Sequence, residues 1–132
     1  MNRSKVNIKQ WIPLIFWILL IFGLSSIPNI SGEKLKLPSG SDKVVHFIEY
    51  MVFALLYYRG LSHDRKVRKS FFVLLVLMTG FALAALDEYY QRYIPGRDSS
   101  VYDIMADLIG VLVGSAIYFG FGERIGRVLD RI

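Results

Sequence analysis

Four apolar segments alternate with polar segments along this chain of 132 residues. The first, Trp11 to Ile27, and the third, Ser70 to Leu86, contain no charged side chain. The other two reach the roughly 20 residues needed to span a bilayer only by including acidic residues near their beginnings. The pattern predicts an all-α integral membrane bundle, a single domain over residues 1–132, with transmembrane helices at about 11–27, 43–60, 70–91 and 101–121.

The composition supports a membrane location. Hydrophobic residues make up 54% of the chain and the mean hydropathy is +0.41, more apolar surface than so short a soluble domain can bury. A basic start before an apolar run is also typical of a signal peptide, but no A-x-A cleavage site follows, which favours a first transmembrane helix. Because cysteine is absent, disulfides, a thiolate nucleophile and a cysteine metal site are excluded.

The net charge of +5 would suggest a nucleic-acid partner in a soluble protein, but here we attribute it to basic loops and expect no nucleic acid. With four helices, eleven Lys and Arg residues fall on the side that holds both termini, and five fall on the other. The positive-inside rule therefore predicts a multi-pass protein of the cell membrane with cytoplasmic N- and C-termini. The loops at 29–43 and 87–103 then face outward. The oligomeric state stays open.

Polar and small side chains recur at helical spacing on three of the segments. The spacing i, i+4, i+7, i+11 places each set on one helix face. The ionisable groups lie at the outer end of each stripe. The stripes are Asp42, His46, Glu49 and Phe53; Gly80, Ala84, Asp87 and Gln91; and Asp103, Asp107, Gly110 and Gly114.

The small residues predict close packing of the third and fourth helices beneath the acids, because a G-x-x-x-G step lets helices approach in lipid. The result would be a pocket with a packed floor and a polar mouth. Each acid also has a simpler explanation as a helix cap, a solvated helix end or an interfacial group. Aromatic residues are predicted to form interface belts. They include Trp11, Trp17, Tyr57, Tyr58, Tyr89, Tyr90, Tyr93 and Tyr118.

The segment between the third and fourth predicted helices contains a predicted turn, a helix cap and two arginines. Pro95-Gly96 predicts a type II turn. Ser100 with Asp103 matches a capping box for the fourth helix. We expect Arg92 and Arg97 to offset the repulsion between the acids. Ionisable groups in the apolar zone usually mark function.

Three stretches resemble the VanZ-like family of bacterial membrane proteins. They are DKVVHFIEYMVFALL from Asp42, DEYYQRYIPGRDSSVYD from Asp87 and DLIGVLVG ending at Gly114. The resemblance covers somewhat over half of the chain. One departure is Asp107, where the family more often has Asn, so this chain carries an additional negative charge.

The resemblance implies a small polytopic helical domain of the cell envelope. It also implies a link to antibiotic resistance, because the family's namesake is associated with resistance to teicoplanin, a lipidated glycopeptide, more than to vancomycin. The first hypothesis is a protein that binds or remodels a lipid-linked or amphiphilic headgroup at an outward polar pocket. Its ligand-binding candidates are Asp42, His46, Glu49, Asp87, Glu88, Gln91, Arg97, Asp103 and Asp107.

The alternative is a membrane-embedded hydrolase or transferase, dependent on a divalent metal or on a carboxylate pair, that acts on a lipid-linked substrate. Whether the chain is an enzyme stays open. A transport path is disfavoured because the acids crowd one end of the helices. The catalytic candidates are Asp87, Glu88, Asp103 and His46, and the candidate ligands of a divalent metal are His46, Asp87, Asp103 and Asp107.

Overall fold

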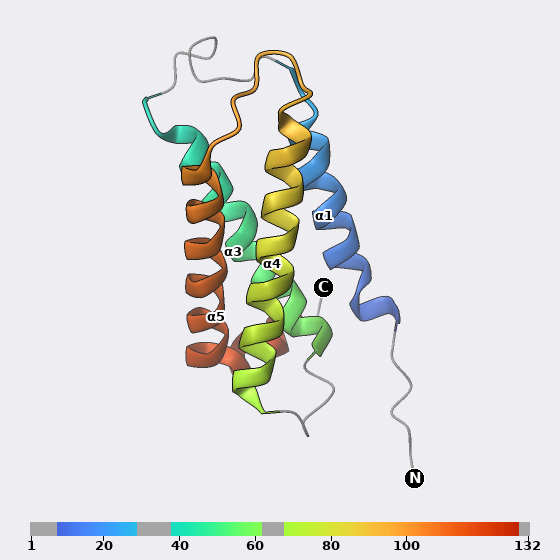
Figure 1. Cartoon of the computed structure of the whole chain (residues 1–132). Coiled ribbons are helices and arrows are strands. Elements are labelled where there is room, and N and C mark those ends of the chain that lie inside the picture. Colours follow the sequence, from blue (N-terminus) through green and yellow to red (C-terminus); the bar gives the residue numbers. More distant parts are fainter. Residues whose placement is uncertain (1–7, 29–37, 62–67, 130–132) are drawn as a thin grey trace.

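The computed structural model describes residues 8–28, 38–61 and 68–129, and these residues form helices and no strand (Figure 1). Four of the helical stretches are long and apolar enough to cross a membrane, so the predicted all-helical membrane bundle is confirmed. The elements are a 3₁₀ turn η1 (Ile8–Gln10), α1 (Ile12–Ser25), α3 (Ser41–Leu61), α4 (Lys69–Gln91) and α5 (Val101–Leu129). The orientation in the membrane stays a prediction.

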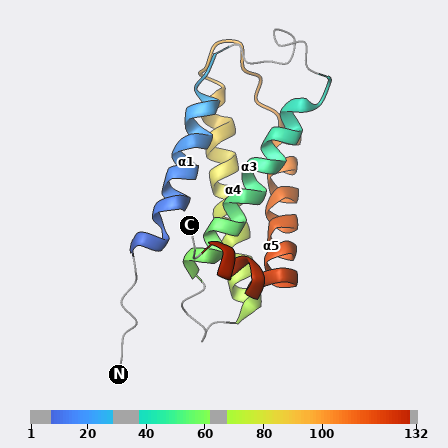
Figure 2. The same cartoon turned by 180° about the vertical axis from the view of Figure 1, so that it is seen from behind.

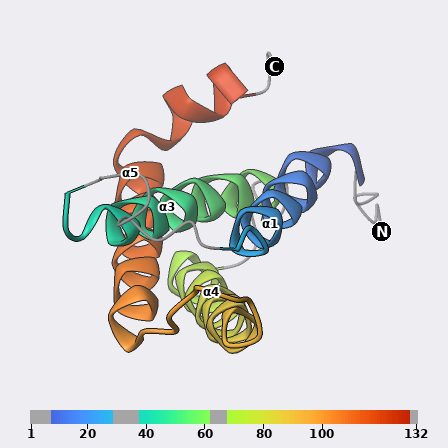
Figure 3. The same ribbon diagram turned by 90° about the horizontal axis from the view of Figure 1, so that it is seen from above.

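Helix α1 ends at Ser25, slightly before its predicted end. The backbone N–H of Ser26 donates to the Phe22 carbonyl at 3.0 Å, and the Ser26 hydroxyl donates to the same oxygen at 2.6 Å. The Phe22 carbonyl therefore accepts two hydrogen bonds from Ser26 at the end of the helix. Helix α5 differs in the opposite sense, because it continues past the predicted residue 121 to Leu129. Its last turns leave the axis of the rest of the helix (Figure 3).

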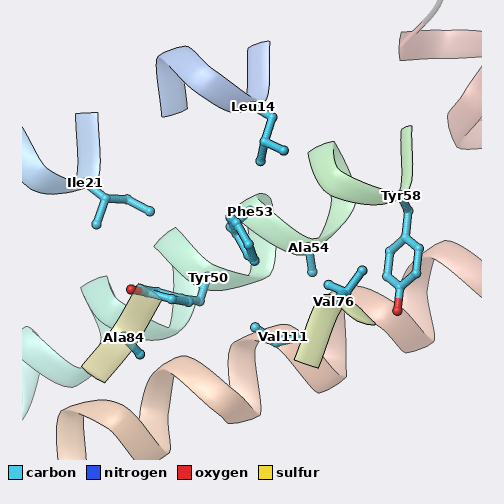
Figure 4. Close-up of a cluster of buried hydrophobic side chains, with 9 residues drawn as sticks. All are labelled: Leu14, Ile21, Tyr50, Phe53, Ala54, Tyr58, Val76, Ala84 and Val111. Carbon is cyan, nitrogen blue, oxygen red and sulfur yellow. The ribbon is translucent and has the colours of Figure 1, made fainter. Parts of the chain in front are cut away.

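Helix α3 is the centre of the bundle. It packs on α1, α4 and α5, and Figures 2 and 3 show α1 and α5 on different sides of it. Its buried side chains Tyr50, Phe53 and Ala54 meet side chains from the other three helices (Figure 4). Many large apolar side chains face outward instead, among them Phe16, Leu74 and Leu112 on the other helices. Such a surface suits lipid contact and not water.

The closest helix approach lies between α5 and α3, which corrects the prediction that the glycine step would pack the third and fourth helices together. A Cβ atom at Gly110 would meet the carbonyl oxygen of Phe47, and one at Gly114 would lie 2.6 Å from the carbonyl oxygen of Met51. Both glycines therefore face the α3 backbone. The small residue of α4 that does touch α5 is Gly80, where a Cβ atom would lie 2.9 Å from Val111.

Tyr58 does not fit the predicted interface belts. Tyr58 is 1% exposed and belongs to the core between α3 and α5. Its hydroxyl donates to Ser115 Oγ at 2.9 Å, and its ring stacks on Tyr118 with 4.8 Å between ring centroids. The hydrogen bond satisfies the polar tip of the ring, which is why a tyrosine is tolerated inside the bundle.

Candidate functional site

The polar stripes meet at one end of the bundle, where α1 ends, α3 and α5 begin, and the 92–100 segment leaves α4 (Figure 1). Polar side chains from all four helices are buried together there, and we call them the polar cluster. None of them is more than 8% exposed. The polar cluster consists of Ser25, His46, Glu49, Asp87, Glu88, Gln91, Asp103 and Asp107.

His46 and Asp107 form the centre of the polar cluster. Nδ1 of His46 lies 3.0 Å from Oδ1 of Asp107, and Asp107 is 0% exposed. The contact joins α3 to α5, one turn above the close approach at Gly110. When the imidazole is neutral and Nδ1–H donates to Asp107, this contact fixes the tautomer and leaves the lone pair on Nε2.

Asp87 is held by α1 and by its own helix. Its Oδ2 accepts from the Ser25 hydroxyl at 2.9 Å and from Gln91 Nε2 at 3.1 Å. Gln91 Nε2 also lies 3.2 Å from Ser25 Oγ, so the three side chains form a closed triangle. The triangle ties the end of α1 to the end of α4.

The predicted capping box at the start of α5 forms only in part. Ser100 Oγ accepts from the backbone N–H of Tyr102 at 3.2 Å, as a cap should. In a capping box the backbone N–H of Ser100 would donate to the Asp103 side chain. Here this N–H donates to Glu88 Oε2 at 2.8 Å instead. The Asp103 carboxylate instead accepts from Lys43 Nζ at 3.1 Å. Glu88 therefore replaces Asp103 in the cap, and Asp103 turns toward α3.

The predicted turn is confirmed, and its arginine donates to a backbone carbonyl instead of pairing directly with an acid. Gly96 has φ +75° and the Arg97 N–H donates to the Ile94 carbonyl, as in a type II turn. Arg97 Nη2 then donates to the Leu24 carbonyl at 2.7 Å, and within the described ranges Arg97 forms no ion pair with an acid. Carbonyls at a helix C-terminus lack partners and attract cations, which explains this choice.

Lys43 pairs directly with two acids at this end of the bundle, which the two arginines do not do in the described part of the chain. It lies at the rim of the polar cluster with its side chain 41% exposed, and it bridges Asp42 and Asp103. Asp42 is exposed, so it belongs to the rim and not to the buried set. Arg92 is exposed and its Nε points to Ser99 Oγ at 3.4 Å.

Several buried polar atoms of this region lack a hydrogen-bond partner in the described part of the chain. They include Oδ1 of Asp87, Oε1 of Glu88 and Oδ2 of Asp107, together with the Tyr50 hydroxyl and Nε of Arg97. A buried acceptor without a donor costs about 1–3 kcal/mol, and more when it is charged. Unsatisfied atoms concentrated at one place therefore call for a partner, such as ordered water, an ion or a bound group.

Three side chains offer ligand atoms within 4.8 Å of one another, close enough to share a metal ion: His46, Glu88 and Asp103. His46 and Asp103 were among the predicted metal ligands, and Glu88 was among the catalytic and headgroup-binding candidates. The other two predicted ligands lie outside this group. Asp107 contacts the imidazole of His46, and Asp87 is held by Ser25 and Gln91.

Sequence reasoning missed three residues of this region. Ser25 lies on an apolar helix with no polar stripe, so only its position at the helix end could have singled it out. Lys43 was counted as a loop charge, although its place beside Asp42 at the start of a helix was a usable signal. Tyr50 adjoins Glu49 and was noted only in the family resemblance; it is 0% exposed.

The family model for VanZ/LLP1 matches residues 2–122, and so covers nearly all of the chain. The chain belongs to the VanZ-like family. No curated protein and no solved structure gave a match. The matched range contains every residue of the polar cluster, so the buried acids are part of the VanZ-like domain itself.

Proposed function

We propose that this VanZ-like protein binds the headgroup of a lipid-linked or amphiphilic molecule at its polar cluster, on the outer side of the cell membrane. The observation that carries the proposal is the set of buried carboxylate oxygens on Asp87, Glu88 and Asp107 that lack a donor. Such oxygens are costly in an apolar bundle, so they call for an incoming donor. Amine and hydroxyl groups of a headgroup would supply it.

Cationic side chains at the same end would bind the anionic part of the headgroup. Lys43 is partly exposed at the rim, and the half-buried Arg97 keeps an Nε without a partner. A guanidinium suits phosphate or carboxylate because its planar fork can donate two parallel hydrogen bonds. A headgroup that carries both an amine and a phosphate therefore fits the charges best.

Binding to a simple lipid tests the proposal directly. Purified protein in detergent would be titrated with short-chain phosphatidylethanolamine or phosphatidylglycerol, and bound lipid would be counted by native mass spectrometry. We expect a preference for the amine-containing lipid. Asp87→Asn and Arg97→Ala should each weaken binding by about tenfold or more, since a hydrogen bond to a charged group contributes about 1.5–3 kcal/mol.

The matched controls are Asp98→Asn and Arg92→Ala, which change the same residue types at exposed positions of the same segment. Both should bind lipid as the unchanged protein does. Equal binding of the two lipids by every variant would contradict the proposal.

We further propose that this site contributes to teicoplanin resistance, as the family suggests. A sensitive bacterium would express the chain, Arg97→Ala or Asp103→Asn at matched membrane levels. The expected result is protection against teicoplanin and less against vancomycin, lost in both variants. Protection that survives in both variants would separate resistance from the polar cluster.

A further inference from the structure

We propose that His46, Glu88 and Asp103 bind a divalent transition-metal ion, Zn²⁺ or Mn²⁺. The inference deepens the proposed function, on which it rests for the presence of a headgroup beside the ion. The three side chains come from α3, α4 and α5, and their ligand atoms lie within 4.8 Å of one another. Each residue is buried, at 6%, 3% and 4% exposure respectively. A shared ion would explain why three helices direct ionisable groups to one point.

The hydrogen bonds around these side chains prepare them as ligands. Asp107 holds Nδ1 of His46, and this carboxylate–imidazole arrangement commonly orients a metal-binding histidine through its other nitrogen. The Ser100 N–H holds Oε2 of Glu88, while Oε1 of Glu88 is buried without a partner. Each supporting contact thus leaves one ligand atom free.

The charge of the region also favours a divalent cation. Five carboxyl groups are buried in the polar cluster, and two cationic side chains accompany them, because a histidine that binds a metal is neutral. If all were ionised, an excess of three negative charges would remain, which a divalent ion would reduce to one. The carboxyl groups are those of Glu49, Asp87, Glu88, Asp103 and Asp107, and the cations are Lys43 and Arg97.

The ligand types select the metal. Ca²⁺ takes six to eight oxygen ligands and Mg²⁺ keeps several waters, so neither favours an imidazole. Imidazole with carboxylates suits Zn²⁺, and carboxylates also suit Mn²⁺. Three protein ligands leave a coordination position open. A phosphate oxygen of the headgroup could take this position, beside Lys43 and Arg97.

Metal content of the lipid-free protein tests the inference. Protein purified in detergent would be stripped with a chelator, dialysed in parallel against Zn²⁺, Mn²⁺, Mg²⁺ and Ca²⁺, and measured by inductively coupled plasma mass spectrometry. We expect about one Zn²⁺ or Mn²⁺ per chain and little Mg²⁺ or Ca²⁺. His46→Ala, Glu88→Gln and Asp103→Asn should each weaken binding by about 100-fold or more, because even supporting residues cost 10- to 100-fold.

A control variant locates the site. Asp98→Asn removes an exposed acid of the 92–100 segment that lies outside the polar cluster. This variant should still bind one ion per chain. If Asp98→Asn loses the ion as Glu88→Gln does, the three-residue assignment is wrong.

Cobalt substitution keeps the test decisive if a ligand variant fails to fold. Co²⁺ added to the stripped, unchanged protein should give visible absorption bands of nitrogen and oxygen ligation, which added Zn²⁺ abolishes. Absence of these bands, or of any bound ion, would overturn the inference. Lipid binding by the stripped protein is measured separately, so a bound metal without lipid binding would reject only the proposed function.

Discussion

At the residue scale, three buried acids of the polar cluster are held by neighbours of different chemistry. Asp107 contacts an imidazole, Asp103 an ammonium group, and Glu88 a backbone N–H. In Glu88 and Asp107 the second oxygen is buried without a partner in the described part of the chain, so it stays available for a bound group. Replacing an acid with its amide therefore changes charge and ligand capacity more than it changes packing.

Two substitutions of Asp107 distinguish the effect of its hydrogen bond on stability from the effect of its charge. Asp107→Asn keeps an oxygen that can accept from His46 Nδ1, so we expect a melting temperature close to that of the unchanged protein when both are free of metal. Asp107→Ala removes the acceptor of a buried imidazole and should cost about 1–3 kcal/mol. Thermal melting in detergent, followed by tryptophan fluorescence, measures both. Equal melting of all three proteins would show that the His46–Asp107 contact contributes no stability.

At the element scale, the contact between α3 and α5 positions the site. Gly110 and Gly114 bring the two backbones together directly below His46 and Asp107. A helix pair separated by larger side chains would hold these two groups too far apart for a hydrogen bond. The core side chains Tyr50, Phe53 and Val111 then fill the space toward α1 and α4 (Figure 4).

Gly110→Ala tests this dependence. The added Cβ atom would meet the backbone of α3, which cannot move as a flexible side chain does, so we expect a loss of about 1–3 kcal/mol or more in stability. Gly120→Ala is the matched control, since no atom lies within 4 Å of a Cβ there and alanine favours helix. Melting curves of the two variants give the comparison. A Gly110→Ala protein as stable as Gly120→Ala would contradict the close approach.

The sequence predicted the helices and three of the four contributing faces, because polar side chains repeated at helical spacing on α3, α4 and α5. It did not predict Ser25, because α1 is apolar on all sides and offers no periodic signal. It did not predict the hydrogen bond from Arg97 to the Leu24 carbonyl, since a periodic pattern does not tell whether a long side chain reaches an acid or a nearby carbonyl. Partner choice depends on the packing of distant segments.

At the scale of the whole molecule, the described cations fall unevenly on the two ends of the bundle. Lys9, Arg59, Arg68, Lys69 and Arg124 lie near the end opposite the polar cluster, whereas Lys43, Arg92 and Arg97 lie near it. Positively charged loops stay in the cytoplasm, so the polar cluster should face outward. The headgroup proposal requires this orientation.

Cysteine labelling tests the orientation in a chain that has no native cysteine. Asp98→Cys and Arg68→Cys place single thiols at exposed positions beyond opposite ends of α4. A membrane-impermeant maleimide should label Asp98→Cys in intact cells, and Arg68→Cys only after the membrane is permeabilised. The reverse labelling pattern would place the polar cluster in the cytoplasm.

The hydrogen bond from Ser100 to Glu88 constrains the length of the connection between α4 and α5. It joins the two ends of the 92–100 segment, while Arg97 fixes its middle to the end of α1. One inserted residue lengthens an extended chain by roughly 3.5 Å, more than the whole length of that hydrogen bond. Substitutions of exposed side chains in this connection leave the contact intact. An insertion or deletion would move the Ser100 N–H away from Glu88, so we expect relatives that use the same site to share the length of this loop.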